Sequence, residues 1–416
     1  MRHFVLVPHE ICVVPYGTGK FFLSEMIFNC DASPTAMTAP LQGAYKVSEK
    51  RNLELLNTFI SPLKGEVDAS IASRRKGWDT LCSRFVNNFQ FTYKRITNMY
   101  DKYNRKIDYL RISLTDRCNL HCRYCQPEVS EHVPHNEILR YEELLRICRA
   151  ALQLGIRKFK ITGGEPLLRK GCSDFIASLK QLDGVEQVTL TTNGTLLSQQ
   201  LPALIAAGVD SINVSLDTLD AAYYKELTGG SLSSVLQALQ ELQAAGIPFK
   251  LNCVPLAENG PADIMQLLKL AHRYNAPLRF IELMPLDCNT NLQGLSGSEI
   301  RSQLEQAGLQ LQPDAQRYGN GPASYWRISG YKMPVGFIEP LHNKFCAVCN
   351  RVRLTSIGML KPCLYSNEGM NLKRLLRDGG SDADLLQAMQ EIIYAKPEGH
   401  SFDVEAAQFN MNQIGG

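Results

Sequence analysis

The chain has 416 residues, of which 44% are hydrophobic and 20% are charged, as expected for a globular protein long enough for two domains and an appendage. Its formal net charge of +3 is too small to indicate nucleic-acid binding by itself. No apolar run approaches the roughly 20 residues of a membrane span, and Pro8, Glu10 and Pro15 interrupt any N-terminal signal, so we expect a cytoplasmic protein.

Residues 1–98 contain short apolar stretches, a polar middle and a basic patch, without a regular pattern. We treat them as an N-terminal extension of unknown role. We expect this extension to be poorly ordered.

Residues 99–310 alternate between short runs rich in β-branched residues and longer amphipathic segments. We predict strands at 110–114, 158–162, 185–192, 211–216, 249–254 and 278–284. The segments between them have helical periodicity, and several end at a glycine. Six successive strand–helix units imply a parallel sheet with right-handed crossovers. The predicted fold is therefore α/β, a partial (β/α)6 barrel.

Polar, glycine-rich or ligand-type residues recur where these strands end. They are the first cysteine cluster, "GGEP" (163–166), "TTNG" (191–194), Ser215 with Asp217, Asn252 and Met284. In such barrels the chemistry collects at the carboxyl ends of the strands. The recurrence therefore predicts an active site at this rim.

Residues 311–416 form a smaller predicted α+β domain. Segments 325–340 and 351–365 have the pattern of hairpin strands, and segments 372–380 and 382–395 have helical patterns. This part of the chain also contains a second group of three cysteines.

Both cysteine groups have three members with compact spacing. Cys118, Cys122 and Cys125 follow Cys-x₃-Cys-x₂-Cys, and Cys346, Cys349 and Cys363 follow Cys-x₂-Cys-x₁₃-Cys. Structural zinc takes four ligands, which His121 and His342 could complete, giving a zinc-stabilised scaffold that binds nucleic acid. A 4Fe–4S cluster held by three thiolates instead leaves one iron open to a small molecule. The spacings favour two iron–sulfur clusters over zinc.

These residues also carry a resemblance to a known family. The first cysteine spacing, Tyr124 before its last cysteine, and "GGEP" after the second strand resemble the radical S-adenosylmethionine (SAM) enzymes. The second trio, "RVR" (351–353) within it and the terminal Gly415-Gly416 narrow the resemblance to the GTP 3′,8-cyclases of molybdenum cofactor biosynthesis. It extends from about Met99 to Gly416 and leaves the N-terminal extension unexplained.

The resemblance implies conversion of GTP to 3′,8-cyclo-7,8-dihydro-GTP with SAM and two 4Fe–4S clusters. The first trio would hold the cluster that cleaves SAM, and the second trio a cluster that meets the guanine ring. The implied SAM contacts are Tyr124, Gly164, Glu165, Ser215, Arg279 and Met284. The implied GTP contacts are Arg111, Lys160, Thr191, Lys250, Arg351 and Arg353. The implied catalytic set joins the first trio to Arg351, Arg353, Gly415 and Gly416.

The charge of GTP supports this assignment. A triphosphate carries about four negative charges, and clustered Arg and Lys side chains can bind them. Arg111, Lys160 and Lys250 are predicted to point into the barrel interior, where unpaired cations would be costly to bury. At Lys160 the family would have arginine, so one bidentate contact is replaced by a point charge.

The resemblance also implies partners. They are a flavodoxin- or ferredoxin-type electron donor and, functionally, the next enzyme, cyclic pyranopterin monophosphate synthase; a homodimer is allowed, and no nucleic acid or membrane is expected. Besides the zinc scaffold, one alternative stays open at this point. It is another radical SAM enzyme with an auxiliary cluster, such as a peptide maturase.

Overall fold

The computed structural model describes four N-terminal strands within residues 3–29, and residues 98–125, 132–285, 289, 291–400 and 411–415. The chain divides into two compact units, residues 1–93 and 94–416. In the first unit the strands form an antiparallel sheet in the order β1-β4-β3-β2. They are β1 (His3–Leu6), β2 (Val14–Tyr16), β3 (Lys20–Leu23) and β4 (Met26–Asn29). The other residues up to 97 lie outside the described residues, so the expected poor order of the extension stays a prediction.

The second unit is built on a 12-stranded sheet whose middle six strands run parallel in chain order. These strands are β5 (Tyr109–Ser113), β6 (Lys158–Thr162), β7 (Gln187–Thr192), β8 (Ser211–Ser215), β9 (Phe249–Cys253) and β10 (Leu278–Ile281). Each coincides with a predicted strand to within three residues. The predicted α/β fold with a partial (β/α)6 barrel is confirmed.

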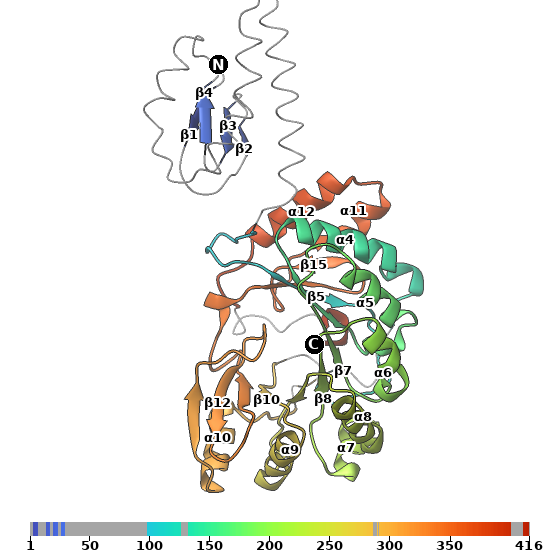
Figure 1. Ribbon diagram of the computed structural model, residues 1–416, viewed down its shortest axis with the longest axis vertical. Coiled ribbons are helices and arrows are strands. Elements are labelled where there is room, and N and C mark those ends of the chain that lie inside the picture. The colour runs from blue at the N-terminus through green and yellow to red at the C-terminus, as the bar shows by residue number, and fades with distance from the viewer. Residues whose placement is uncertain are drawn as a thin grey trace, which may run out of the picture. The chain divides into compact units, whose positions relative to one another are not determined.

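Helices cover one face of these strands, which leaves the other face for a site (Figure 1). They are α4 (Tyr141–Gln153), α5 (Cys172–Lys180), α6 (Leu197–Ala206), α7 (Ala221–Thr228), α8 (Leu232–Ala244) and α9 (Pro261–Arg273). In α4 the buried Leu144, Ile147, Cys148 and Ala151 recur at helical spacing, and this apolar stripe joins the core.

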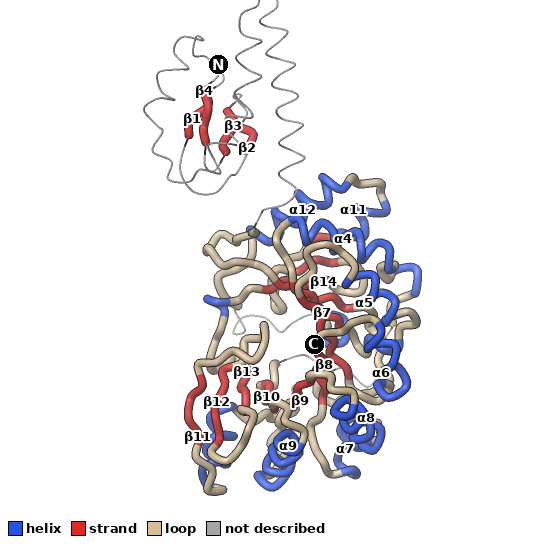
Figure 2. Tube along the Cα trace, viewed as in Figure 1, coloured by secondary structure: helices blue, strands red, loops and turns tan. Residues whose placement is uncertain are grey.

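The strands after residue 310 extend the same sheet at its two ends (Figure 2). β11 (Leu311–Asp314), β12 (Ser324–Ile328) and β13 (Val335–Ile338) continue beyond β10, and β14 (Arg351–Leu354), β15 (Met359–Lys361) and β16 (Met370–Asn371) continue beyond β5. The two predicted hairpins are confirmed as β12–β13 and β14–β15. The domain boundary at residue 310 stays a prediction.

The last predicted strand is three residues longer than the observed one. We expected a strand over 278–284, but β10 ends at Ile281, the residue that pairs with Ile338 at the end of β13. With no ladder partner beyond that pair, the chain leaves the sheet, and Met284 lies in the following loop.

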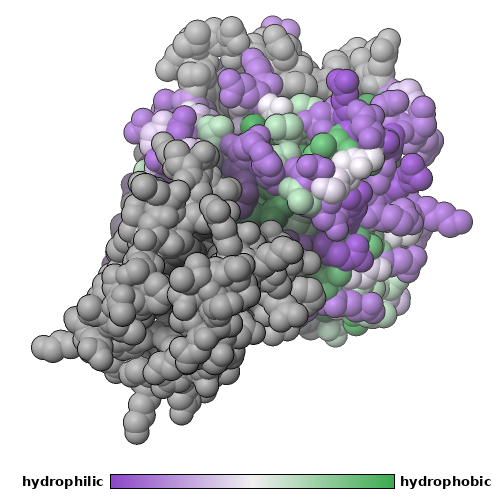
Figure 3. All heavy atoms as spheres, turned by 90° about the horizontal axis from the view of Figure 1, so that it is seen from above, coloured by the Kyte–Doolittle hydropathy of each residue, from purple (hydrophilic) through white to green (hydrophobic). Residues whose placement is uncertain are grey.

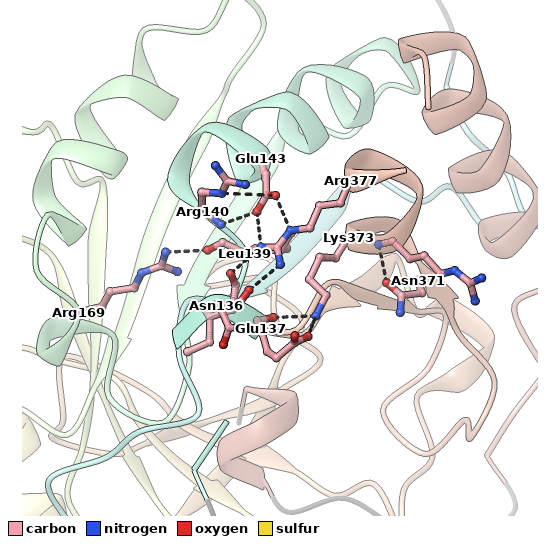
Figure 4. A network of polar contacts seen from close by, with 11 residues as sticks. Asn136, Glu137, Leu139, Arg140, Glu143, Arg169, Asn371, Lys373 and Arg377 are labelled. Carbon is pink, nitrogen blue, oxygen red and sulfur yellow. Dashed lines mark hydrogen bonds and ion pairs between the residues drawn. The ribbon is translucent and has the colours of Figure 1, made fainter. Parts of the chain in front are cut away.

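The remaining helices are α10 (Gly297–Gln306), α11 (Leu372–Arg377), α12 (Asp382–Tyr394) and α13 (Met411–Ile414). Figure 4 shows how α11 holds the loop before α4: Arg377 donates to the carbonyl of Ile138 at 3.1 Å and pairs with Glu143 at 2.8 Å. Lys373 donates to the carbonyl of Glu137 at 2.9 Å. These contacts tie the segment that follows the first cysteine trio to the C-terminal part of the chain.

The surface of the described residues is mostly hydrophilic on the face shown in Figure 3, with apolar residues in small patches. The helices that the structure describes include none with the length and apolar character needed to cross a membrane.

Candidate active site

A cavity of about 330 Å³ extends along the uncovered face of the parallel strands and is lined by all six clustered cysteines. Strand alternation explains its walls, because every second residue of a strand points to the same side. On β5, Leu110 and Ile112 are fully buried in the core, whereas Tyr109 and Arg111 line the cavity. The same alternation brings Lys160, Thr191, Ser215 and Lys250 into its wall.

The first cysteine trio lies on the loop after β5, beside the turn after β6. Gly164 donates to the carbonyl of Thr115 at 2.7 Å, and Glu165 donates to that of Arg117 at 2.8 Å. A Cβ on Gly164 would lie 2.3 Å from the Arg117 carbonyl oxygen, so only glycine permits this approach. "GGEP" therefore fixes the backbone that leads directly into Cys118.

The sulfur atoms of this trio lie in surroundings that suit a metal-bound thiolate. The Cys118 Sγ accepts from the Leu120 amide at 3.4 Å and from the Asn193 side-chain amide at 3.7 Å. Burial raises the pKa of Cys118, and it raises that of Cys122 well above the ordinary value. A bound metal would offset this effect of burial, because coordination stabilises the thiolate form of a cysteine.

Tyr124 is fixed by a buried carboxylate. Its hydroxyl donates to Asp217 at 2.7 Å, and the Val254 amide donates to the other carboxylate oxygen at 2.9 Å. Burial raises the pKa of Asp217 to about 6. Asn289 also donates to the carbonyls of Tyr124 and Met284, at 3.1 and 3.0 Å, so the loop after β10 is joined to the cysteine loop.

The structure brings most of the predicted SAM contacts into this cavity: Tyr124, Gly164, Ser215, Arg279 and Met284. Glu165, in contrast, is fully buried. It accepts from the Leu167 amide at 3.0 Å, the Thr192 hydroxyl at 2.8 Å and the Asn193 amide at 2.7 Å. Burial raises its pKa to about 7. In this arrangement its contacts are to the turn that presents Asn193 to Cys118.

Buried cations gather on the inner face of the sheet. Arg353, Arg111 and Lys160 occupy neighbouring positions in register on β14, β5 and β6. Burial lowers the pKa of Arg111 to about 10 and that of Lys250 to about 8. The pKa of Lys160 falls well below its usual value, first through burial and then through the surrounding cations Arg279, Arg111, Lys250 and Arg351. Such a cluster is costly to bury and favours a polyanionic ligand.

Two further predicted residues join this cationic region. The hydroxyl of Thr191 accepts from Asn213 at 3.2 Å. Arg279, predicted as a SAM contact, donates to Asn252 from Nε at 2.9 Å and lies among the cations that act on Lys160. Its position therefore also suits a phosphate contact.

The second cysteine trio lies on the cavity wall formed by β14 and its flanking loops. Cys346 is in the 3₁₀ turn η5 (Cys346–Val348), Cys349 precedes β14, and Cys363 follows β15. Burial tends to raise the pKa of Cys349, but Lys396 and Arg351 outweigh it, so that the net shift is downward. Arg351 also contacts the rings of Phe345 and Tyr109, at 5.6 and 5.9 Å from their centroids.

Neither of the two histidines considered as zinc ligands is among the residues that line the cavity. His342 binds the Glu282 carboxylate through Nδ1, and its side chain is 68% exposed. His121 is exposed. Within the described ranges, no three His, Cys, Asp or Glu side chains are close enough together to hold a single metal ion.

The C-terminal tail enters the same region. Arg353 donates to the Gly415 carbonyl at 2.9 Å, Met411 donates to that of Cys125 at 3.2 Å, and Asn412 donates to that of Asp116 at 3.1 Å. Gly415 has a φ of +81°, and a Cβ there would lie 2.7 Å from Thr162. The tail thus reaches the ends of β5 and β6; Gly416 lies outside the described residues.

Three residues of the site were missed in the sequence. Asn193 stands in a motif that we noted, but nothing local indicated its contact with Cys118. Asn289 and Lys396 lie far along the chain from the groups they contact, so only the fold reveals them. Three thiols facing a common cavity, with amide donors at Cys118 and a cation at Cys349, are a donor set that fits iron–sulfur clusters at both trios.

Comparison with known families gives two matches along the chain. Residues 112–271 match the Radical SAM superfamily, and residues 276–402 match Molybdenum Cofactor Synthesis C. Curated relatives named GTP 3′,8-cyclase cover 76% of this chain. Those of Clostridium perfringens and Thermodesulfovibrio yellowstonii are 38% and 40% identical and are covered over 100% of their length. That of Geobacter sulfurreducens is 41% identical and is covered over 99% of its length.

Among solved structures, SuiB of Streptococcus suis bound to S-adenosylmethionine has a similar fold. Its TM-score is 0.52 at 17% identity, and the match covers 83% of this chain and 77% of that one.

Proposed function

The chain belongs to the GTP 3′,8-cyclase family of radical SAM enzymes, and we propose that it converts GTP to 3′,8-cyclo-7,8-dihydro-GTP, the first step of molybdenum cofactor biosynthesis. This membership replaces the peptide maturase and the zinc scaffold that the sequence left open. The observation that carries the proposal is the shared cavity, whose wall contains both cysteine trios and a group of buried cations. An anionic substrate bound to those cations would lie within reach of both trios.

The first trio and its surroundings bind the cosubstrate in this proposal. Cys118, Cys122 and Cys125 would hold a 4Fe–4S cluster, which would supply the electron for reductive cleavage of SAM and so the means of abstracting hydrogen from the ribose C3′ of GTP. Tyr124, Gly164, Ser215 and Met284 form the wall against which SAM is oriented. Asp217 holds Tyr124 in place through the 2.7 Å hydrogen bond.

The buried cations bind the triphosphate. Arg111, Lys160, Lys250 and Arg279 lie on four different strands, so together they can contact several phosphate oxygens and exclude water. Because Lys160 is a point charge rather than a guanidinium fork, we expect one phosphate contact to be less directional.

Cys346, Cys349 and Cys363 would hold a second 4Fe–4S cluster in this proposal, and the guanine would bind on their side of the cavity. Arg353 links this side of the cavity to the tail through its 2.9 Å contact with Gly415. We assign the tail to the closure of the cavity, with Gly415 and Gly416 at its end.

The partners expected from the sequence are part of the proposal. A flavodoxin- or ferredoxin-type protein would supply the electron, and cyclic pyranopterin monophosphate synthase would take the product. A cytoplasmic location and the option of a homodimer complete the proposal.

Isotope transfer tests the function directly. With GTP deuterated at C3′, SAM and a reductant, deuterium is expected in 5′-deoxyadenosine. Cys118→Ala should abolish SAM cleavage, whereas Cys363→Ala should retain some cleavage and lose cyclisation. Cys148→Ala, in the core at 0% exposure, is the matched control and should retain both. Cleavage of SAM without transfer from C3′, or full cyclisation by Cys363→Ala, would contradict the proposal.

A further inference from the structure

Residues 396–400 lie beside the second cysteine trio, and they belong to none of the sequence motifs described above. Lys396 is 2% exposed, and its Nζ donates to the carbonyl of Arg351 at 2.9 Å and to that of Pro362 at 2.5 Å. These two residues lie just after Cys349 and directly before Cys363 in the chain. One ammonium group thus joins the backbone beside two of the three cysteines.

The same ammonium lies against the trio itself. Its positive charge acts on the Cys349 thiol and lowers the pKa of that group. A Cβ on Gly399 would lie 3.9 Å from the Cys346 sulfur, so the segment passes close to a second ligand position. The Lys396 ammonium therefore lies where negative charge on the trio, or on a group that the trio holds, interacts with it through the protein interior rather than through solvent.

Arg105 fixes this segment and the remaining cysteine. Its guanidinium donates to the carbonyls of Cys346 at 2.8 Å, Pro397 at 2.6 Å and Glu398 at 2.7 Å. Its own charge is paired with the buried Asp101 at 2.6 Å. Lys396 differs in this respect, because the oxygen acceptors of its ammonium are neutral backbone carbonyls rather than carboxylates.

A buried ammonium without a carboxylate partner is costly unless negative charge lies nearby. Three thiolates and the cluster that they hold supply such charge, and reduction of the cluster adds one more electron. A cation fixed beside a cluster stabilises its reduced state more than its oxidised state, and hydrogen bonds and charge around the sulfurs are known to set cluster potentials.

We propose that Lys396 is a positioning residue for the second cluster, holding the backbone beside Cys349 and Cys363 and raising the reduction potential of the cluster by its buried charge. The proposal rests on the second cluster of the proposed function.

The test compares three full-length variants reconstituted without oxygen. Lys396→Met removes the charge, Lys396→Arg retains it, and Lys344→Met removes an exposed lysine two residues before Cys346 as the matched control. All are made with Cys118, Cys122 and Cys125 replaced by alanine, so that spectroscopic signals come from the second cluster alone. Iron and sulfide are counted, and the midpoint potential is measured by redox titration followed by electron paramagnetic resonance.

We expect Lys396→Met to lower the equilibrium constant for reduction of the second cluster at least tenfold. For one electron, a tenfold change is a shift of the midpoint potential by 59 mV to more negative values. Lys396→Arg and Lys344→Met should stay close to the parent. If the Lys396→Met protein does not hold the second cluster, retention of that cluster by Lys396→Arg supports the proposal. Loss of the cluster from both variants overturns the proposal. An unchanged potential in a fully loaded Lys396→Met protein also overturns it. A parent protein that binds no second cluster would instead refute the proposed function.

Discussion

Gly164 offers a sharp test of how the first trio is positioned. Gly164→Ala places a Cβ 2.3 Å from the carbonyl oxygen of Arg117, and 2.8 Å from that of Asp116. An ordinary contact begins near 3.4 Å, so the Arg117 carbonyl must retreat by 3.4 − 2.3 = 1.1 Å. Both neighbours are backbone atoms and cannot rotate aside. The displacement therefore passes to Cys118, the next residue.

We expect Gly164→Ala to have a large effect on the reaction rate and a moderate effect on the stability of the fold. Overpacking of this kind costs about 1–3 kcal/mol of stability, whereas a 1 Å misplacement of a reacting group can cost about 100-fold in rate. We expect Gly164→Ala to lower 5′-deoxyadenosine formation from SAM by about that factor. Gly260→Ala is the control, because no atom lies within 4 Å of the added Cβ.

The assay measures iron content and reductive SAM cleavage on the same anaerobic samples. Cleavage by Gly164→Ala within about threefold of the parent, at full iron content, would show that the loop is not fixed by this contact. An equal loss in Gly260→Ala would show a general effect of stiffening the backbone.

Three further perturbations test other parts of the site. Burial lowers the pKa of Lys250 to about 8, so kcat/KM for GTP should fall as the pH rises through about 8 and the amine loses its charge. Lys250→Arg should remove this pH dependence. A pH profile of Lys250→Arg identical to that of the parent would refute the prediction. Arg353→Met removes the 2.9 Å hydrogen bond to the Gly415 carbonyl. Because such charged hydrogen bonds contribute about 1.5–3 kcal/mol, GTP turnover should fall at least about tenfold while SAM cleavage continues. Loss of both activities together would contradict the role of Arg353 in holding the tail. Arg105→Met removes the ion-pair partner of the buried Asp101 carboxylate and should lower the free energy of unfolding by about 3–5 kcal/mol. Denaturant titration measures this change, and the exposed Arg374→Met is the control, with an expected change of less than about 1 kcal/mol. Equal effects of the two substitutions would refute the argument.

The parts of the fold that repeat locally were predictable. β6 was predicted at its observed bounds, because a β-branched run between turn signals has few other solutions. The rim motifs followed, since parallel strands bring their carboxyl ends to the same edge. The end of β10 was not predictable, because it depends on Ile338 of β13, a partner distant in sequence.

The site was predictable where a motif carries the chemistry, and not where the fold alone supplies a contact. The cysteine trios and the cations Arg111 and Lys250 line the cavity as expected. Glu165 shows the limit of a motif, because "GGEP" gives its position but not the direction of its side chain, which accepts from Thr192 and Asn193. Lys396 shows the other limit, because no spacing links it to Cys349.

The central claim is that each three-cysteine group holds a 4Fe–4S cluster on the wall of a GTP-binding cavity. Iron, sulfide and zinc per chain, counted on protein reconstituted without oxygen, test it most directly. We predict about eight irons with matching sulfide and no zinc. Two zinc ions without sulfide would contradict the claim and, with it, the radical chemistry assigned to this site.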